Sequence, residues 1–335
     1  MKSIDVFCHL MPKKYAELAM NESPNKSHMF VRALKMQAMS DMDYRLEVLK
    51  QFPGYKQIPN IVSPPVELFA GPDKSPKIAA VGNDEIKKIT EDHPEVYEGF
   101  IAGIPFNNVQ ASVDEIKRCK AMGAKGVQIY THMNGEAIDQ EKFWPIYEIC
   151  EKLDLPILLH PVGGQMTPEF PTETRSKYEL WFTIGWPYQT TVAMFRLAFS
   201  GIFEDFPNLK IITHHVGAMV PMLEGRIENG LKMYGTRTAP ELKDELTRTK
   251  MKGNPLDTFK KYYADTASFG SASAIRAGID FFGTDHILFA SDMPFDPEQG
   301  PGYIDRTLKA IDQLQLPQAD QEAILSGNAQ RIFHL

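Results

Sequence analysis

Histidine and aspartate side chains follow several segments that we predict to be buried β-strands. The histidines at these positions are His9, His132, His160, His214 and His215, five of the nine in the chain. Asp292 follows the last predicted strand. Imidazole and carboxylate groups bind divalent metals and transfer protons near neutral pH. If the fold brings these strand ends together, the sequence predicts a metal-binding or acid–base site.

Eight short runs rich in apolar and β-branched residues predict parallel strands covered on both faces. These runs are residues 3–8, 58–63, 97–104, 126–130, 157–160, 209–213, 262–265 and 287–290. Amphipathic helical stretches lie between most of them, at residues 112–122, 143–153, 190–203 and 219–233. The alternation predicts one α/β domain, residues 1–335, folded as a (β/α)8 TIM barrel. In that fold the strand ends meet at the active-site mouth.

Two long segments interrupt this alternation, and we expect both to be loops that shape the site. Residues 10–57 follow the first strand and are rich in Met and Lys. Residues 162–189 follow the fifth strand and are rich in Gly, Pro, Thr and aromatic side chains. In the second segment, Trp186 and Tyr188 are expected either to line an aromatic substrate pocket or to anchor the loop. Residues 236–255 are expected to form a helical excursion at the surface.

The composition excludes several classes of protein. The 335 residues are 43% apolar and 24% charged, as in ordinary globular domains. The net charge of −7 predicts no broad attraction to nucleic acid or to an anionic membrane. No apolar run is long enough to span a bilayer. Three cysteines, Cys8, Cys119 and Cys150, predict reduced thiols and a cytoplasmic protein.

Five motifs occur in order along almost the whole chain: IDVFCHLMP, GAKGVQIYTHMNG, LPILLHP, FPNLKIITHHVGAMVPMLEGRI and LFASDMPF. In these motifs the chain resembles the amidohydrolase superfamily, in the branch of aminocarboxymuconate-semialdehyde decarboxylase and γ-resorcylate decarboxylase. The resemblance implies a divalent metal held by His9, His160 and Asp292, with zinc expected and manganese as the alternative. It also implies a homodimer.

The same resemblance implies roles for residues outside the metal site. His215 looks like the catalytic histidine beside the metal-bound water, and Arg226 like the arginine that pairs with a substrate carboxylate. A planar guanidinium suits bidentate carboxylate binding. Arg45 is a second candidate by position only, and a solvated or helix-paired guanidinium is its alternative interpretation.

Position 7 departs from the branch, which has His-x-His or Glu-x-His where this chain has Phe7-Cys8-His9. Residues 7 and 9 of a strand point to one face, so Phe7 would occupy the place of a metal ligand. Cys8 would point away as a small buried residue. Three protein ligands and a water can still form a catalytic zinc site. A metal-free barrel is the alternative that the resemblance also implies, through a related lactonase group of the superfamily that works without metal.

Two further histidines, His214 and His132, lie next to the predicted strand ends. Alternation is taken to send His214 toward the outer layer as a structural residue. His132 lies slightly beyond its strand and is expected to line either the mouth or the surface.

Together these features predict an enzyme: a metal-dependent, non-oxidative decarboxylase of a small aromatic or conjugated carboxylic acid. Asp292 would also act as a catalytic acid, Arg226 and Trp186 would bind substrate, and no organic cofactor is needed. One alternative is a hydrolase of a lactone or amide bond, in which His215 activates water. Another is a barrel that has lost catalysis and binds a small ligand.

Overall fold

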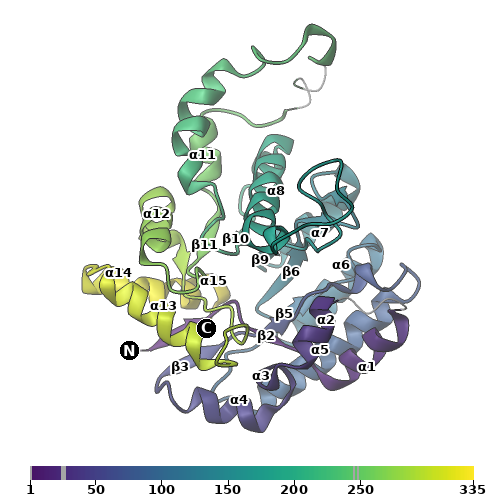
Figure 1. Cartoon of the computed structure of the whole chain (residues 1–335), viewed down its shortest axis with the longest axis vertical. Helices are drawn as coiled ribbons and strands as arrows, with labels where there is room; N and C mark the ends of the chain where they lie inside the picture. Colours follow the sequence, from purple (N-terminus) through teal and green to yellow (C-terminus); the bar gives the residue numbers. More distant parts are fainter. Residues whose placement is uncertain (1, 24–27, 244–245, 247–248) are drawn as a thin grey trace.

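Parallel strands form the barrel that the sequence predicts (Figure 1). The structure is a computed structural model that describes residues 2–23, 28–243, 246 and 249–335. The barrel strands are β1 Ser3–Asp5, β2 His9–Leu10, β3 Tyr55–Gln57, β4 Asn60–Ile61, β5 Ile101–Gly103, β6 Gly126–Tyr130, β9 Ile157–His160, β10 Ile211–Thr213, β11 Tyr263–Asp265 and β12 Ile287–Leu288. Hydrogen-bonded neighbours follow the order β12-β11-β10-β9-β6-β5, while β1 pairs with β3 and β2 with β4. A short antiparallel ribbon, β7 His132–Met133 with β8 Glu136–Ala137, follows β6.

Backbone hydrogen bonds close the ring between these sets of strands. Ile58 N donates to Asp5 O at 2.8 Å, and Ile101 N donates to Pro59 O at 2.9 Å. On the other side, Val6 N donates to the carbonyl oxygen just beyond β12, that of Phe289, at 3.0 Å. One apolar cluster takes its members from strands all round the ring and fills the interior, as in other TIM barrels. It includes Ile4, Val6, Phe7, Ile58, Ile101, Leu158, Ile212, Leu288 and Ala290.

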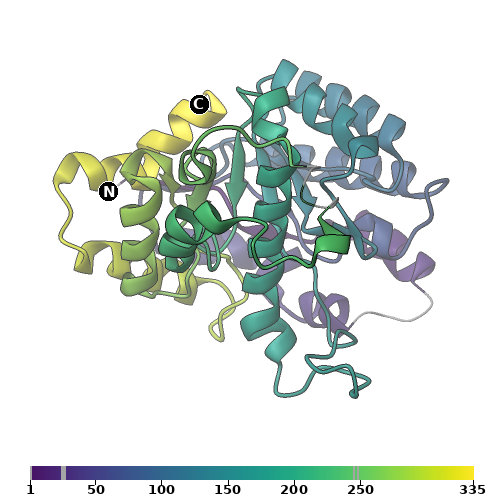
Figure 2. The ribbon, with the colours of Figure 1, turned by 90° about the horizontal axis from the view of Figure 1, so that it is seen from above.

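Helices cover the outside of the ring (Figures 1 and 2). They are α1 Lys13–Glu22, α2 His28–Leu34, α3 Gln37–Ser40, α4 Met42–Leu49, α5 Ser75–Asp92, α6 Val109–Ala121, α7 Trp144–Lys152, α8 Trp186–Ser200, α9 Ile202–Asp205, α11 Pro255–Phe259, α12 Ala272–Phe282, α13 Pro301–Gln313, α14 Gln318–Glu322 and α15 Asn328–Phe333. The predicted helices at 112–122 and 143–153 correspond to α6 and α7, and 190–203 corresponds to α8 with α9. Within the described residues, no helix is both long and apolar enough to cross a membrane.

Residues 10–57 do not form the long loop that we predict, because α1, α2, α3 and α4 occupy much of this segment. Each of the first two helices buries one side. Tyr15 and Ala19 of α1 and Phe30 and Ala33 of α2 belong to one apolar cluster. Three of the methionines in this segment, Met11, Met36 and Met39, are core residues of the same cluster. Unbranched methionine fills irregular gaps between such short helices.

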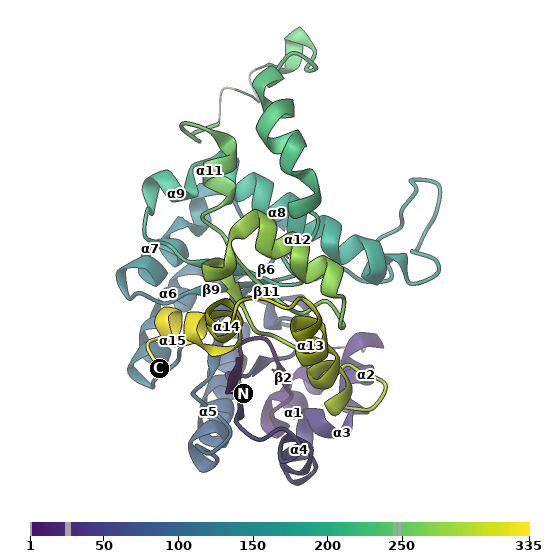
Figure 3. The ribbon, with the colours of Figure 1, turned by 90° about the vertical axis from the view of Figure 1, so that its left-hand side faces the viewer.

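The stretch 219–233 does not form the continuous helix that its apolar spacing predicts. It consists of a 3₁₀ turn at Pro221–Leu223, a π-helical turn at Arg226–Gly230 and a second 3₁₀ turn at Leu231–Met233. Its two glycines weaken any regular helix. Figures 1 and 3 show the green segment before α11 extending beyond the barrel. In the predicted excursion 236–255, residues 244–245 and 247–248 lie outside the described residues, and the described part includes a 3₁₀ turn at Pro240–Leu242.

The segment after β9 is irregular only as far as residue 179, so the last part of the loop that we predict at 162–189 is helical instead. Figures 2 and 3 show the teal loop projecting from the body. A π-helical turn at Trp181–Gly185 then leads directly into α8. Trp186 donates its indole N–H to the carbonyl oxygen of Gly163 at 3.0 Å. This bond ties the start of α8 to the beginning of the loop.

The first predicted strand, 3–8, is interrupted. β1 ends at Asp5 and β2 begins at His9, so Phe7 and Cys8 lie in the break. Phe7 N donates to Asp5 Oδ1 at 3.1 Å, and Phe7 O accepts from Asp292 N at 3.0 Å. The Phe7 side chain nevertheless points into the barrel and is fully buried. Cys8 is also fully buried, as we predict.

Arg45 is neither solvated nor paired within its own helix, so the alternative interpretation of this residue is wrong. Its side chain is fully buried. Nη1 donates to the carbonyl oxygens of His9 and Ala38 at 2.8 and 2.9 Å. Nε and Nη2 donate to Gln57 Oε1 at 3.1 and 2.7 Å. Arg45 therefore joins α4 to the strand that carries His9.

We predict that Arg45→Met destabilises the protein because it leaves three buried oxygen acceptors without their donors. The free energy of unfolding should fall by about 3 kcal/mol, measured by urea unfolding. Arg175→Met is the matched control, because Arg175 is exposed and its replacement should change stability little. Equal stability of the two variants would contradict this role for Arg45.

Candidate functional site

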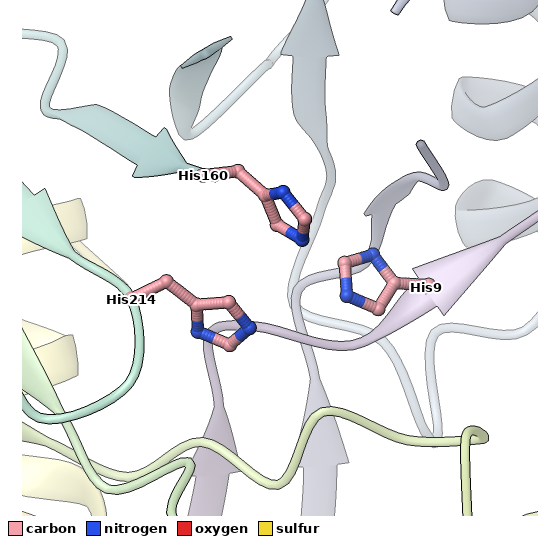
Figure 4. A group of neighbouring side chains, drawn as sticks. All are labelled: His9, His160 and His214. Atoms are coloured by element: carbon pink, nitrogen blue, oxygen red, sulfur yellow. The ribbon is translucent and has the colours of Figure 1, made fainter. Parts of the chain in front are cut away.

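Three buried histidines meet at the mouth of the barrel (Figure 4). His9 begins β2, His160 ends β9, and His214 directly follows β10. One ring nitrogen from each lies within 4.8 Å of the others. Figure 4 shows the three rings directed at a common centre. The strand order explains the meeting, because β9 and β10 are hydrogen-bonded neighbours and β2 lies across the ring.

Asp292 completes this histidine cluster from the loop after β12. Its Oδ1 lies 2.9 Å from His9 Nε2 and 3.5 Å from His214 Nε2. His214, His215 and Asp292 form a second group whose ligand atoms lie within 4.8 Å of one another. The structure thus brings together the predicted ligands His9, His160 and Asp292, and it adds two adjacent imidazoles.

The Nδ1 atoms of three histidines are engaged by neighbouring oxygens. His160 Nδ1 contacts Pro161 O, His214 Nδ1 contacts the Asp265 carboxylate, and His215 Nδ1 lies 3.1 Å from Ala267 O. Such contacts fix the ring and direct Nε2 into a metal site or toward a substrate. Among the described residues, Nε2 of His215 is buried without a hydrogen-bond partner, whereas Nε2 of His214 faces Asp292 Oδ1 at 3.5 Å.

Burial and neighbouring charges shift the pKa values of these groups in different directions. Burial lowers the pKa of His160 well below 6.5, and neighbouring imidazoles lower it further. Burial lowers the pKa of His215 to about 4. Burial opposes charge on His214 as well, but the Asp265 and Asp292 carboxylates outweigh it and raise the pKa of His214 to about 9. Burial would raise the pKa of Asp292, yet hydrogen bonds from His214 and His9 hold it well below 3.8.

The expectation that His214 points to the outer layer is wrong. Ile212 belongs to the interior cluster, and strand alternation places His214, two residues later, on the same side. His215 reaches the mouth by a different route, since its backbone has a φ of 61°. This left-handed conformation turns the chain, and the two imidazole centroids lie 3.8 Å apart.

Several residues at the site adopt a left-handed backbone conformation. Asp292 has a φ of 65°, and Val216 and Ala218 also lie in the left-handed region, at 60° and 55°. Each such non-glycine residue costs of order 1 kcal/mol, so it persists only where surrounding contacts hold it. Strain of this kind is common where a side chain must be aimed at a ligand.

Phe7 occupies the place that we predict for a lost ligand. Its ring stacks on His214 with centroids 4.0 Å apart and lies 6.0 Å from the His160 ring. A phenyl ring cannot coordinate a metal, but it packs the floor of the cluster and holds His214 from one face. His214 stacks on Phe7 and carries a ring nitrogen, whereas the side chain at position 7 has no atom that can bind a metal.

A pocket of about 880 Å³ opens above the cluster and has Asp292 in its lining. Its aromatic walls are Trp181, Phe182, Trp186, Phe269, Phe295 and Tyr303. His215 lies behind two of these walls, with its ring 6.3 Å from Trp186 and 5.6 Å from Phe269. Trp186 is 6% exposed. It lines the pocket, and its hydrogen bond to Gly163 O anchors the loop, so both alternatives that we expect for it hold together.

The remaining predicted residues lie elsewhere. Arg226 is exposed and is not among the residues that line this pocket. Tyr188 is exposed, and with His132 it lines a smaller, separate pocket of about 170 Å³ beside α8. Sequence reasoning missed Arg32, which lines the large pocket, because it lies in a segment that we predict to be a loop.

The donor set fits a divalent metal. Three imidazoles and a carboxylate converge, and among the described residues His9 Nδ1 and His215 Nε2 are buried without a hydrogen-bond partner. Unpaired buried polar atoms are costly unless a ligand satisfies them. Neutral imidazole and carboxylate are the ligands of zinc and of manganese sites.

Comparisons with known proteins agree with this geometry. The family model described as "Amidohydrolase" matches residues 4–335. The 2-amino-3-carboxymuconate-6-semialdehyde decarboxylase of Dictyostelium discoideum is 26% identical over 294 residues, which cover 86% of this chain and 75% of the relative. The gamma-resorcylate decarboxylase of Polaromonas sp. (strain JS666) is 26% identical over 315 residues, 90% of each chain.

A solved structure shows the same fold. It is a dihydroxybenzoic acid decarboxylase from Polaromonas sp. JS666 with bound manganese and the inhibitor 2-nitroresorcinol. The TM-score is 0.77 at 23% identity, with coverage of 100% of this chain and 97% of the other.

A buried carboxyl group that sequence reasoning missed lies near the mouth, after β4. Glu67 is 4% exposed, and its Oε2 has no hydrogen-bond partner among the described residues. Burial raises its pKa to about 8. Its charge would also face two buried phenols, Tyr15 and Tyr130, whose pKa values are raised in part by Glu67. Glu67 is therefore protonated in the folded protein at neutral pH.

We predict that Glu67 makes folding stability depend on pH. The folded carboxyl holds its proton up to pH 8, whereas the unfolded one releases it near its ordinary value of 4.5. Its contribution is therefore full below pH 4.5 and is lost as the pH rises through 8. Glu67→Gln should flatten the decline of unfolding free energy across this window, measured by urea unfolding at several pH values. Glu17→Gln, at an exposed position, should keep the wild-type slope, and an unchanged slope in Glu67→Gln would refute the assignment.

Proposed function

Because the chain belongs to the amidohydrolase family, we propose that it is a metal-dependent, non-oxidative decarboxylase of a small aromatic or conjugated carboxylic acid. The observation that carries this proposal is the position of the histidine cluster and Asp292 beneath a pocket with aromatic walls. Flat aromatic side chains suit a planar conjugated substrate. The two relatives described above are both named decarboxylases.

His9, His160 and Asp292 would hold the metal, and His214 lies within the same cluster. When bound, a divalent ion supplies Lewis-acid polarisation of substrate oxygen atoms. We propose zinc as the ion, with manganese as the alternative that the Polaromonas decarboxylase supports. The residues fit either ion, because both accept imidazole and carboxylate ligands.

The chain's own residues supply binding and proton transfer. The aromatic walls orient the substrate ring and exclude water from it. His215 is the base, since its Nδ1 is held by Ala267 O and its neutral Nε2 is free to accept a hydrogen bond from a substrate hydroxyl. His214, kept protonated beside Asp265, gives a proton to Asp292, and Asp292 passes that proton to the carbon bearing the carboxylate. Solvent then restores the proton of His214, so one proton is taken up for each CO2 released. Loss of CO2 then restores the conjugated system, which is why no organic cofactor is required.

Several finer assignments belong to the same proposal. Residues 1–335 act as a single domain, the enzyme is a homodimer, and it functions in the cytoplasm. The role of Arg226 as a carboxylate partner stays a prediction from the family resemblance. Its side chain is exposed and is not part of the pocket lining.

The direct test is release of CO2 from a panel of hydroxybenzoates and unsaturated carboxylic acids by the metal-loaded protein. We expect stoichiometric CO2 and a product lacking one carboxylate for at least one acid. A parallel panel of lactones and amides distinguishes the hydrolase, which would open rings without releasing CO2. Turnover only in the second panel would refute the decarboxylase.

We predict that His215→Gln lowers kcat by about 100-fold or more, because it removes the acceptor at Nε2. Metal content and melting temperature should stay close to wild type, since His215 is not one of the proposed ligands. His132→Gln is the matched control, because that ring lies in the separate smaller pocket. Unchanged turnover in His215→Gln would remove the role assigned to it.

A further inference from the structure

Residues 165–177, in the loop after β9, carry exposed apolar side chains beside the large pocket. Met166 is 76% exposed and lines the pocket. Phe170 is 65% exposed and lies outside the pocket lining. Figures 2 and 3 show this teal loop projecting from the body. Exposed apolar side chains at the rim of a ligand pocket indicate a surface that becomes covered when the ligand binds.

The loop is braced within itself. Ser176 N donates to Gln165 O at 2.8 Å, which brings the two ends of the loop together. Between these ends, Ser176 Oγ donates to the Glu169 carboxylate, and Lys177 Nζ lies 2.5 Å from Glu173 Oε1. Close ends and internal side-chain contacts are the features of an Ω-loop, a compact unit that often has a functional role.

Among the described residues, no hydrogen bond or ion pair ties this loop to the barrel. All those that involve residues 165–177 stay within residues 164–181. No side chain of the loop belongs to the apolar clusters of the core. The loop is therefore braced internally but is free to turn as one body about its two ends.

The backbone at both ends of the loop suits a hinge. Gly163 and Gly164 precede the loop, and glycine has the widest choice of backbone angles. A Cβ atom on Gly164 would meet no atom of the described residues within 4 Å apart from its chain neighbours, so this end has room to move. Tyr178 and Glu179 follow the loop, with φ of 55° and 56°. Two consecutive non-glycine residues in the left-handed region are strained, and a turn of the loop that lets them leave this region relieves the strain.

We propose that residues 165–177 form a lid that closes over the large pocket and places Met166 and Phe170 against the bound ring. This inference rests on the proposed function for the chemical class of the ligand, an aromatic or conjugated acid. Closure buries both apolar side chains against a planar ring, which offsets the cost of ordering the loop. It also keeps water away from the reacting carbon, so that this carbon receives its proton from Asp292.

Limited proteolysis with trypsin reports the position of the lid without requiring turnover. Arg175 and Lys177 are exposed in the loop, so trypsin cleaves after them while the lid is open. Arg237, exposed in the excursion beyond the barrel, is the internal control. The measurement is made on metal-loaded protein in the His215→Gln background, so that 2,6-dihydroxybenzoate and the other acids of the panel are not consumed.

We expect a saturating acid to slow cleavage after Arg175 and Lys177 by about tenfold and to leave cleavage after Arg237 unchanged. Protection should not depend on protein concentration, because the lid closes within one chain. Equal protection at Arg237, or protection that disappears when the protein is diluted at a fixed acid concentration, would overturn the inference. Undiminished cleavage of the loop with every acid of the panel would overturn it as well.

Phe170→Ala tests the contact between the lid and the ring. Because Phe170 is exposed, its replacement should leave the melting temperature unchanged. We expect the Kd of the acid to rise about tenfold, since closure no longer buries a phenyl ring. Trp181 and Trp186 line the pocket, so quenching of tryptophan fluorescence measures binding.

Met222→Ala is the matched control, because Met222 is an exposed apolar side chain that does not line the pocket. It should leave the Kd unchanged. An unchanged Kd in Phe170→Ala, or an equal rise in Met222→Ala, would contradict the contact.

Release of CO2 separates this inference from the proposed function. If an acid protects the loop but no acid of the panel loses CO2 with wild-type protein, the proposed function fails and the lid stands. If an acid loses CO2 but leaves cleavage of the loop unchanged, the lid fails and the proposed function stands.

Discussion

The buried carboxylate of Asp292 is the constraint on which the rest of the mouth depends. An ionised carboxylate that is 4% exposed is costly unless charged or polar partners surround it. His9 and His214 provide those partners at 2.9 and 3.5 Å. Each partner must come from a different part of the barrel, so the geometry of the ring and the chemistry of the site cannot be separated. The positive φ of Asp292 belongs to the same constraint, because it aims the carboxylate inward.

A second buried polar network lies below this cluster. It joins β1, which leads to His9, to the loop that carries Asp292. Asp5 accepts hydrogen bonds from Tyr55 and from Ser291, both at 2.5 Å. Ser291 Oγ also accepts from Met293 N, so the loop that carries Asp292 is tied to β1. Gln57 links Tyr55 to Arg45, and Arg45 holds the carbonyl of His9. The network therefore determines the spacing between His9 and Asp292 without contributing a ligand.

Much of this arrangement could be predicted from the sequence, because parallel strand ends must meet and His and Asp side chains stand at those ends. The errors have separate physical causes. With His215 directed inward, strict alternation puts His214 on the outer layer, but the left-handed turn at His215, which cannot be read from residue types, breaks that alternation. Arg32 lies on a short helix whose burial depends on long-range packing. The family resemblance predicts Arg226 in the pocket, but the chain between His215 and Arg226 forms irregular turns rather than a helix facing the mouth.

We propose that the histidine cluster and Asp292 hold one catalytic metal ion despite Phe7. The most direct measurement is the metal content of the protein, by elemental mass spectrometry, as purified and after reconstitution with zinc or manganese. We predict about one tightly held ion per chain in the wild-type protein. It predicts loss of that ion in His160→Gln, whose fold should persist by circular dichroism. Failure of wild type to retain either ion after reconstitution, or equal retention by His160→Gln, would contradict it.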